Sequence, residues 1–260
     1  MQLGKLVGKG RTAEVYQYGE GKIVKLFLDW CRPSWVEREY KAACVVQSTG
    51  LSVPQASELV EIDGRRGIVY QYVAGPTLLG TMTSKPWTLF AAARLLAEEH
   101  ALIHGKQVSG LPTQRALLQR ELAEGPNIPR DVRERSLAVL DTLPDAAQLC
   151  HGDYHPDNII MSPRGPMVID WSNVTCGNPL ADAARTLLML GSPYLPPETP
   201  AKPIIRAMRQ LFRRAYLSNY LRLTGASLDE VRRWLIPMAA ARLEDRIPEE
   251  REYLLVMLSL

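Results

Sequence analysis

The stretch from Leu149 to Asp170 is LCHGDYHPDNIIMSPRGPMVID, and its polar residues follow one another at defined intervals. Asp153 lies two residues after His151, Asn158 lies five residues after Asp153, and Asp170 ends a short apolar run, MVI. Asp and Asn often cap backbone amides in loops, which is the structural alternative for these residues. His, Gly, Asp, Asn and a strand-borne Asp within twenty-two residues favour a chemical role instead.

Phosphoryl transfer is the chemistry that requires this pattern. One carboxylate must orient the attacking hydroxyl and accept its proton, while other oxygen ligands hold Mg²⁺ on the phosphates. We expect Asp153 to be the catalytic base, Asn158 to offer its amide oxygen to the metal ion, and Asp170 to be the main metal ligand. His151 and His155 are expected to pack or hydrogen-bond within the loop, because Asp153 already supplies the base.

The string HGDYHPDN, followed by an apolar strand and the tripeptide IDW, resembles the aminoglycoside phosphotransferase and choline kinase superfamily. It fits the template H-R-D-x-x-x-x-N with Gly152 in place of the arginine, and Trp171 stands where protein kinases carry the Phe of D-F-G. The resemblance implies an α+β, two-lobe, protein-kinase-like fold, with a small antiparallel-sheet N-lobe that has one helix and a mainly helical C-lobe. It also implies a kinase that uses Mg²⁺ and ATP, with GTP as the open alternative.

The N-terminal segment LVGKGRTAEVY predicts two short strands, Leu3 to Gly10 and Ala13 to Tyr18, with Gly8 and Gly10 in the turn. By itself the segment predicts only a hairpin, because Ala13 replaces the third glycine of G-x-G-x-x-G. The resemblance implies that this hairpin covers the ATP phosphates, where glycine lets backbone amides approach the oxygens closely.

Lys25 lies in the middle of an alternating strand, Lys22 to Leu28, with the sequence KIVKLFL. A buried lysine needs a partner, unless it lies at an edge and extends to water. The next helix opens with Ser34 in a capping-box pattern, SWVE, and offers both Glu37 and Glu39. The resemblance implies that Glu39 pairs with Lys25 and holds it on the α- and β-phosphates, and Glu37 is the competitor.

A second hairpin is predicted for Ala56 to Ile62 and Gly67 to Val73, joined by Asp63 and Gly64. Its end, QYVAGP, leads into the next domain. We therefore expect residues 1–75 to form a nucleotide-binding lobe. Residues 76–260 are expected to form a helical lobe with the catalytic loop and the acceptor site.

The connection between the predicted lobes has a further implied role. The resemblance implies that it is a hinge at which the backbone of Gln71, Tyr72 and Val73 hydrogen-bonds a purine. Because side chains do not contact the base there, the choice between ATP and GTP stays open.

Two histidines and one aspartate of the predicted helical lobe lie outside the catalytic stretch. His100 and His104 are four residues apart, but the segment lacks the glutamate of H-E-x-x-H, so zinc is disfavoured and we expect one histidine to pack beneath the catalytic loop. Asn178 and Pro179 predict the start of a helix. The resemblance implies that Asp182, in its first turn, supports the catalytic loop structurally.

The acceptor is the least specified part of the prediction. No long activation segment and no A-P-E motif follow IDW, which argues against a peptide substrate and favours a small-molecule hydroxyl acceptor. The resemblance to antibiotic kinases suggests Glu244 or Asp245 as contacts for a cationic substrate, although a solvated helix face explains these acids better. An antibiotic and a metabolite are both open as acceptors. A regulator without turnover is disfavoured, because no catalytic residue is missing.

Composition narrows the setting in which the protein is expected to act. A net charge of +3 over 260 residues, with scattered basic positions, predicts no nucleic-acid partner. No apolar run approaches about eighteen residues and the N-terminus lacks an apolar signal core, which predicts no membrane partner. The four cysteines have neither zinc nor disulfide spacing, so we expect free thiols and a cytoplasmic location.

Overall fold

The computed structural model describes residues 3–195 and 201–259, and the chain forms two compact units. The first unit comprises residues 1–81 and 157–172, and the second comprises residues 82–156 and 173–260. The predicted division was at residue 75, whereas the first unit extends to residue 81 and also takes in residues 157–172, which follow Asp153 in the sequence. The stretch from Leu149 to Asp170 is therefore shared between the two units.

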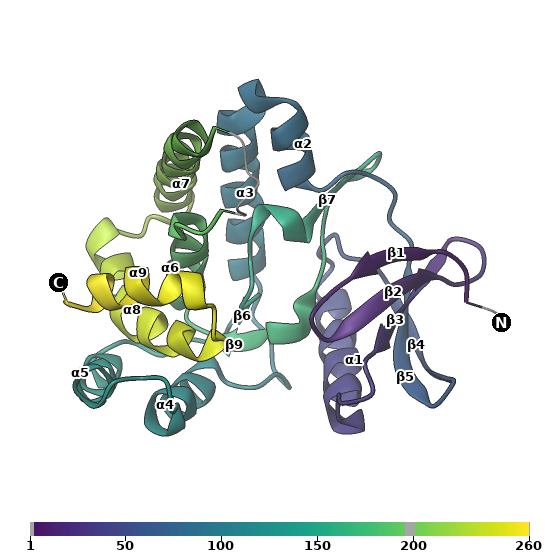
Figure 1. Ribbon diagram of the computed structural model, residues 1–260, viewed down its shortest axis with the longest axis horizontal. Coiled ribbons are helices and arrows are strands. Elements are labelled where there is room, and N and C mark those ends of the chain that lie inside the picture. The colour runs from purple at the N-terminus through teal and green to yellow at the C-terminus, as the bar shows by residue number, and fades with distance from the viewer. Residues whose placement is uncertain (1–2, 196–200, 260) are drawn as a thin grey trace. The chain divides into compact units, whose positions relative to one another are not determined.

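The first unit is built on an antiparallel sheet with the strand order β1-β2-β3-β5-β4 (Figure 1). The strands are β1 (Leu6–Lys9), β2 (Ala13–Gln17), β3 (Lys22–Phe27), β4 (Ala56–Ile62) and β5 (Arg65–Gln71). Helix α1 (Pro33–Ser48) packs against β4 and β5. The unit also contains the hairpin β7 (Ile159–Ser162) and β8 (Gly165–Val168). The expected small antiparallel sheet with one helix is confirmed.

Strand β3 explains why Lys25 is directed toward the helix. Successive side chains of a strand alternate between its two faces. Val24 packs with Tyr18 on one face, whereas Phe27 packs with Val36 of α1 on the other. Lys25 is two residues from Phe27, so it shares the face that α1 covers, and its Nζ lies 5.6 Å from the centre of the Phe27 ring.

The predicted capping box at the start of α1 does not form. The helix begins at Pro33, its N-cap is Arg32, and that residue makes no side-chain capping bond. Proline is well suited to the first helical position, which moves the helix start ahead of Ser34. Glu37 instead forms an ion pair with Arg66 at 2.9 Å.

The turn between β4 and β5 follows directly from its two residues. Asp63 and Gly64 both adopt positive φ, at 51° and 77°, as a tight two-residue hairpin turn requires. Strand β4 has the predicted bounds, whereas β5 begins two residues earlier and ends two residues earlier than expected. The strand therefore ends at Gln71, and Tyr72 and Val73 lie in the connection that follows.

The second unit is mainly helical. Its helices are α3 (Leu89–His104), α4 (Gln114–Glu124), α5 (Arg130–Asp141), α6 (Pro179–Gly191), α7 (Lys202–Thr224), α8 (Leu228–Arg242) and α9 (Pro248–Ser259). It also contains the two-stranded ribbon β6 (Gln148–Cys150) and β9 (Thr175–Gly177), and short 3-10 turns at 86–88 and 243–245. Helix α2 (Leu78–Ser84) and the 3-10 turns at 156–158 and 171–173 cross from one unit to the other along the chain.

Helix α6 is the centre of the second unit. Asn178 caps it by accepting a hydrogen bond from Leu180, as the Asn-Pro signal predicts. The helix packs against both α7 and α8, and α3 packs against α7. The four cysteines are free thiols. Among the residues described, no helix combines the length and the apolarity that crossing a membrane requires.

Candidate active site

Lys25 binds two carboxylates within the first unit. Its Nζ lies 2.7 Å from Oε1 of Glu39 and 3.0 Å from Oδ1 of Asp170. The pairing that the resemblance implied, with Glu39 rather than Glu37, is therefore confirmed. Glu39 is nearly buried, with 10% of its side chain exposed, whereas 43% of the Asp170 side chain is exposed. The cluster thus has a closed side and an open side.

The electrostatics of this cluster keep the lysine charged. Burial lowers the pKa of Lys25, but the negative charges of Asp170 and Glu39 outweigh that effect and raise the pKa above its usual value. Burial also raises the pKa of Glu39, against the attraction of Lys25. A cation fixed in this way can hold the oxygens of a phosphate group.

The two predicted metal ligands lie at the same end of the β7–β8 hairpin. Asn158 precedes β7 and Ile169 follows β8, and the Ile169 N–H donates to the Asn158 carbonyl oxygen at 2.9 Å. Asp170 then adopts φ of 60°, a conformation that is uncommon for residues other than glycine. An amide oxygen and a carboxylate are the hard oxygen donors that suit Mg²⁺. The donor set therefore fits the predicted ion.

The predicted glycine hairpin and hinge support a nucleotide site less directly than the Lys25 cluster does. A Cβ added at Gly8 or Gly10 would meet only ordinary van der Waals contacts, so the chain itself does not require glycine there. In the segment predicted to be a hinge, the Gln71 N–H donates to the Gln55 carbonyl oxygen and the Tyr72 N–H donates to the Gly21 carbonyl oxygen, both at 2.8 Å. These two residues can offer only carbonyl oxygens to a base, and a donor must come from Val73 or beyond.

Asp153 belongs to the second unit, on the loop that follows β6. Gly152 precedes it with φ of 79°, and a Cβ there would collide with the Asn173 carbonyl oxygen, which explains the glycine after the histidine. Burial alone would raise the pKa of Asp153. Hydrogen bonding from His155 and the positive charge of Arg185 outweigh burial, so the pKa lies below its usual value and the carboxylate is ionised at neutral pH.

The loop that carries Asp153 is held from beneath by Asp182. Its two carboxylate oxygens accept the N–H groups of His151 at 2.6 Å and Gly152 at 2.9 Å. Both predicted histidines also point at this carboxylate, with Nε2 of His100 and of His104 each 3.2 Å from Oδ2. The structural role implied for Asp182 is confirmed, and two histidines, rather than one, lie beneath the loop.

Tyrosines of α7 complete this buried cluster. Nδ1 of His100 is 2.7 Å from the Tyr216 hydroxyl, and Nδ1 of His104 is 2.6 Å from the Tyr220 hydroxyl. Because the ionised Asp182 can only accept, each Nε2 must donate to it, and each Nδ1 then accepts from a tyrosine. One ligand atom each of His100, His104 and Asp182 lies within 4.8 Å of the other two, a spacing that could hold a metal ion. The hydrogen bonds described above already account for this arrangement.

Arg185 is a residue that the sequence analysis did not single out. Its Nε donates to the Gly152 carbonyl oxygen at 2.5 Å, and its second terminal nitrogen donates to Asp245 at 2.9 Å. It lies three residues after Asp182 in α6, which places both side chains on one helix face. The three-residue spacing from Asp182 was the only sequence signal for Arg185. It identifies Arg185 as a neighbour of the catalytic stretch only after Asp182 is known to lie beneath that loop.

The C-terminal acids are engaged with residues of the chain itself. Asp245 accepts from Arg185 and, at 3.2 Å, from Arg242. Glu244 accepts from the backbone and side-chain nitrogens of Asn127, at 2.7 and 2.9 Å. Neither acid is a free contact for a cationic substrate.

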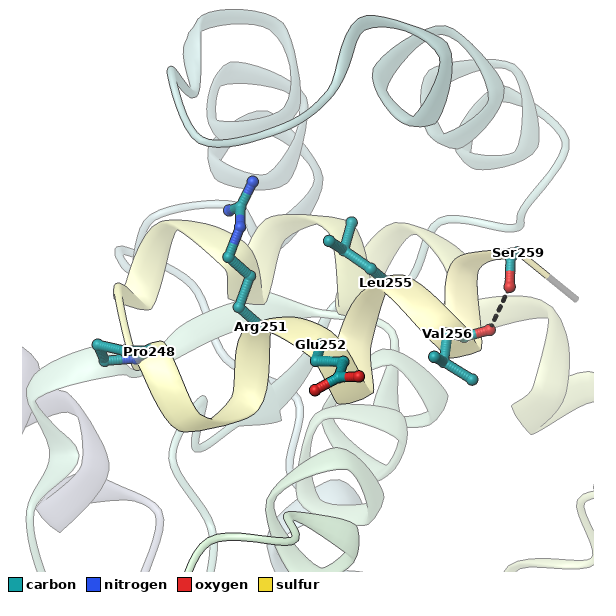
Figure 2. Close-up of a pocket in the computed structure, with 6 residues that line it drawn as sticks. All are labelled: Pro248, Arg251, Glu252, Leu255, Val256 and Ser259. Carbon is teal, nitrogen blue, oxygen red and sulfur yellow. Dashed lines mark hydrogen bonds between the residues drawn. The ribbon is translucent and has the colours of Figure 1, made fainter.

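A hollow along α9 is separate from these groups. Figure 2 shows its lining, which comes from one helix and consists of Pro248, Arg251, Glu252, Leu255, Val256 and Ser259. None of the residues predicted for phosphoryl transfer lines it. The hollow therefore does not mark the active site.

The chain is similar to known proteins over most of its length. Residues 4–226 match the model of the phosphotransferase enzyme family, APH. Acyl-CoA dehydrogenase family member 10 of Mus musculus is 30% identical over 199 residues, which is 67% of this chain and only 18% of that protein.

Among solved structures, a thermostable variant of the aminoglycoside phosphotransferase APH(4)-Ia, in complex with ADP and hygromycin B, has a TM-score of 0.68 and 16% identity. The match covers 99% of this chain and 92% of that one. A choline/ethanolamine kinase family protein from Mesorhizobium loti has a TM-score of 0.58 and 15% identity, covering 100% and 86%. At these identities the structures establish the kinase-like fold.

Proposed function

Because the chain belongs to the phosphotransferase enzyme family, we propose that it transfers the γ-phosphoryl group of ATP to a hydroxyl of a small molecule, with GTP as the alternative donor. The observation that carries this proposal is the ion-paired cluster of Lys25, Glu39 and Asp170. Phosphoryl transfer needs a fixed cation for the phosphates beside a carboxylate that reaches solvent, and this cluster has both.

Each residue of the site has one role in the proposed reaction. Glu39 keeps Lys25 in place, and Lys25 binds the α- and β-phosphates. Asn158 and Asp170 hold Mg²⁺, which neutralises charge on the phosphates when it is bound. Asp153 orients the acceptor hydroxyl and removes its proton as the oxygen attacks phosphorus. The lowered pKa of Asp153 supports this role, because only the ionised form can accept the proton.

A metabolite is favoured over a cationic antibiotic as the acceptor. Aminoglycosides carry several ammonium groups, and a site for them requires carboxylates that are available to bind. Asp245 is already paired with two arginines, and Glu244 is bonded to Asn127. The alternative hypothesis, an antibiotic kinase, predicts that expression of the protein raises the resistance of a sensitive host to at least one hydroxylated drug.

The test is an ADP-release assay with Mg²⁺ and ATP or GTP across hydroxylated metabolites and antibiotics. Asp153→Asn should lower kcat by about 10²–10⁴-fold while nucleotide affinity stays nearly unchanged, because a positioned base contributes about that much. Undiminished turnover in this variant would remove Asp153 from the mechanism. Tight nucleotide binding without turnover on any acceptor would favour a nucleotide-binding regulator.

A further inference from the structure

Two backbone carbonyl groups, one on each side of Asp153, are bound by neighbouring side chains of α6. Nε of Arg185 donates to the Gly152 carbonyl oxygen at 2.5 Å. The hydroxyl of Thr186 donates to the Tyr154 carbonyl oxygen at 2.9 Å, and this bond is buried. The backbone before and after Asp153 is therefore fixed relative to α6, which limits the positions that the carboxylate of Asp153 can take.

The two donors differ in what holds them in place. Thr186 is neutral and fully buried, whereas Arg185 carries a charge and has only 15% of its side chain exposed. Burial would lower the pKa of Arg185, but the negative charges of Asp245 and Asp153 outweigh that effect and raise it. A buried charge needs a partner, and Asp245 binds the second terminal nitrogen of Arg185 at 2.9 Å.

The shape of a guanidinium group transmits this contact. Its donors lie in one rigid plane, so fixing one nitrogen also fixes the direction in which the others donate. Asp245 binds one end of the Arg185 group, and the Gly152 carbonyl oxygen binds the other. The orientation of Arg185 at the catalytic loop therefore depends on Asp245.

Asp245 is itself held by the C-terminal helices. It lies in the 3-10 turn at 243–245 and also accepts from Arg242, at the end of α8, at 3.2 Å. Arg242 is buried and binds both oxygens of the buried Glu250 of α9, at 2.7 and 3.0 Å. A chain of four charged side chains thus runs from α9 to the backbone beside the catalytic base, in the order Glu250, Arg242, Asp245 and Arg185.

We propose that Arg185 is a positioning residue for phosphoryl transfer and that Asp245 sets its orientation. In this role neither residue contacts the reacting groups, and both act through the position of Asp153. The turn between α8 and α9 then takes part in placing the catalytic base. The inference rests on the proposed kinase function for its effect on turnover, but the support of the loop can be measured without turnover.

The first experiment removes the charge of Asp245 with little change of shape. In Asp245→Asn we expect kcat for ADP release to fall by about 10- to 100-fold, because a small misplacement of a catalytic group costs that much. The KM for ATP should stay within about twofold of wild type, since the nucleotide contacts are unchanged. An unchanged kcat in Asp245→Asn overturns the proposal.

A matched control is available on α8. Asp229 also binds an arginine three residues away at 3.2 Å, as Asp245 binds Arg242, but the Asp229 side chain is 87% exposed and its ion pair is with Arg232. Asp229→Asn should therefore leave kcat and KM unchanged. Calorimetric titration with ADP counts the folded molecules in each variant. A fall in kcat that only matches a loss of ADP-binding sites would indicate instability and overturn the proposal.

A double-mutant cycle tests whether Asp245 acts through Arg185. Arg185→Lys keeps the positive charge but loses the rigid plane of donors, so it should lower kcat with the fold retained. If Asp245 acts through Arg185, the double variant should be about as slow as the slower single variant. Effects on kcat that multiply would show that Asp245 acts independently, which contradicts the proposal.

Hydrogen exchange measures the support of the loop without turnover. The N–H groups of His151 and Gly152, which donate to Asp182, should exchange about tenfold faster in Asp245→Asn than in wild type. Asp229→Asn should match wild type. Faster exchange without turnover on any acceptor would retain the role of Arg185 in the loop and remove the kinase function. Turnover with unchanged kcat and unchanged exchange would leave the kinase function standing and remove the role of Arg185.

Discussion

Two aspartates of this protein both accept hydrogen bonds from nitrogen donors, but they differ in their access to solvent. Asp170 accepts from Lys25 in the first unit and has 43% of its side chain exposed, whereas Asp182 accepts from two histidines and two backbone amides in the second unit and is 1% exposed. The hydrogen bonds to Asp182 use both of its buried oxygens, whereas the Asp170 side chain is in contact with solvent. The difference teaches that access to solvent separates a carboxylate that can bind a ligand from one that stabilises a loop.

The largest effect on stability is expected at Asp182. Asp182→Ala would leave buried donors of His100, His104 and the catalytic loop without an acceptor, which should lower the free energy of unfolding by about 3–5 kcal/mol. Urea denaturation measures this loss. Asp229→Ala, whose side chain is 87% exposed, is the control and should stay within about 0.5 kcal/mol of wild type. A similarly small change at Asp182 would break the comparison.

A smaller loss in the free energy of unfolding should appear on acidification. Burial, and then the charge of His104, lower the pKa of His100 to about 3. In the unfolded chain, His100 is protonated near pH 6.5, whereas in the folded protein it stays neutral until the pH approaches 3. The stability that the neutral, buried His100 contributes is therefore present above pH 6.5 and is lost as the pH falls toward 3. Between pH 6.5 and pH 5, protonation of His100 in the unfolded chain should lower the free energy of unfolding by about 2 kcal/mol.

Urea denaturation of wild type and His100→Gln at several pH values tests this expectation. The variant should lose less stability between pH 6.5 and pH 5, and His155→Gln controls for removal of a histidine outside the cluster. The low pKa of Asp182, which hydrogen bonds from both histidines lower against the effect of burial, acts only below about pH 4. Equal slopes in wild type and His100→Gln would contradict the prediction.

Asp170 should show the opposite behaviour. Asp170→Ala is expected to weaken Mg²⁺-dependent nucleotide binding by more than about tenfold, or 1.4 kcal/mol, with a nearly unchanged melting temperature. Calorimetric titration with and without Mg²⁺ measures it. Asp29→Ala, at a side chain 88% exposed in the same unit, is the control. Intact Mg²⁺-ATP affinity would remove Asp170 from the metal site.

The smallest effects should distinguish the two glutamates of α1. Glu39→Gln should weaken ATP binding by severalfold, because Lys25 loses its buried partner. Glu37→Gln removes only a pair with Arg66 in which both side chains are more than 40% exposed, so it should change stability by less than about 1 kcal/mol and leave ATP affinity unchanged. Equal losses of affinity in the two variants would refute the separation.

Local patterns predicted the elements of the chain more reliably than their contacts. The pattern S-x-x-E occurs at Ser34 and again at Ser227, and only the second forms a capping box. The difference lies in Pro33, which starts α1 ahead of its serine. Capping is decided by where the helix begins, which the pattern alone does not specify.

Contacts between distant segments were harder to predict. Tyr216 and Tyr220 are each 116 residues from the histidine that they bind, and nothing in their own helix marks them as partners. Glu244 and Asp245 were expected on a solvated helix face, with contact to a cationic substrate as the alternative. Their partners come from elsewhere in the chain, namely the loop after α4 for Asn127, α6 for Arg185 and the end of α8 for Arg242. The presence of an acidic residue in a sequence does not show whether another side chain neutralises it in the folded protein.

The sequence by itself determined the family, the strand that presents Lys25, the short apolar strand that leads to Asp170, and the loop with Asp153. These depend on alternation, on turn residues and on spacing along a short stretch, which are local properties. The tertiary structure alone decided that Glu39 rather than Glu37 meets Lys25, and that Asp182 is enclosed by two histidines. Those outcomes depend on packing between helices distant in sequence, because burial and charge pairing arise only when the chain has folded.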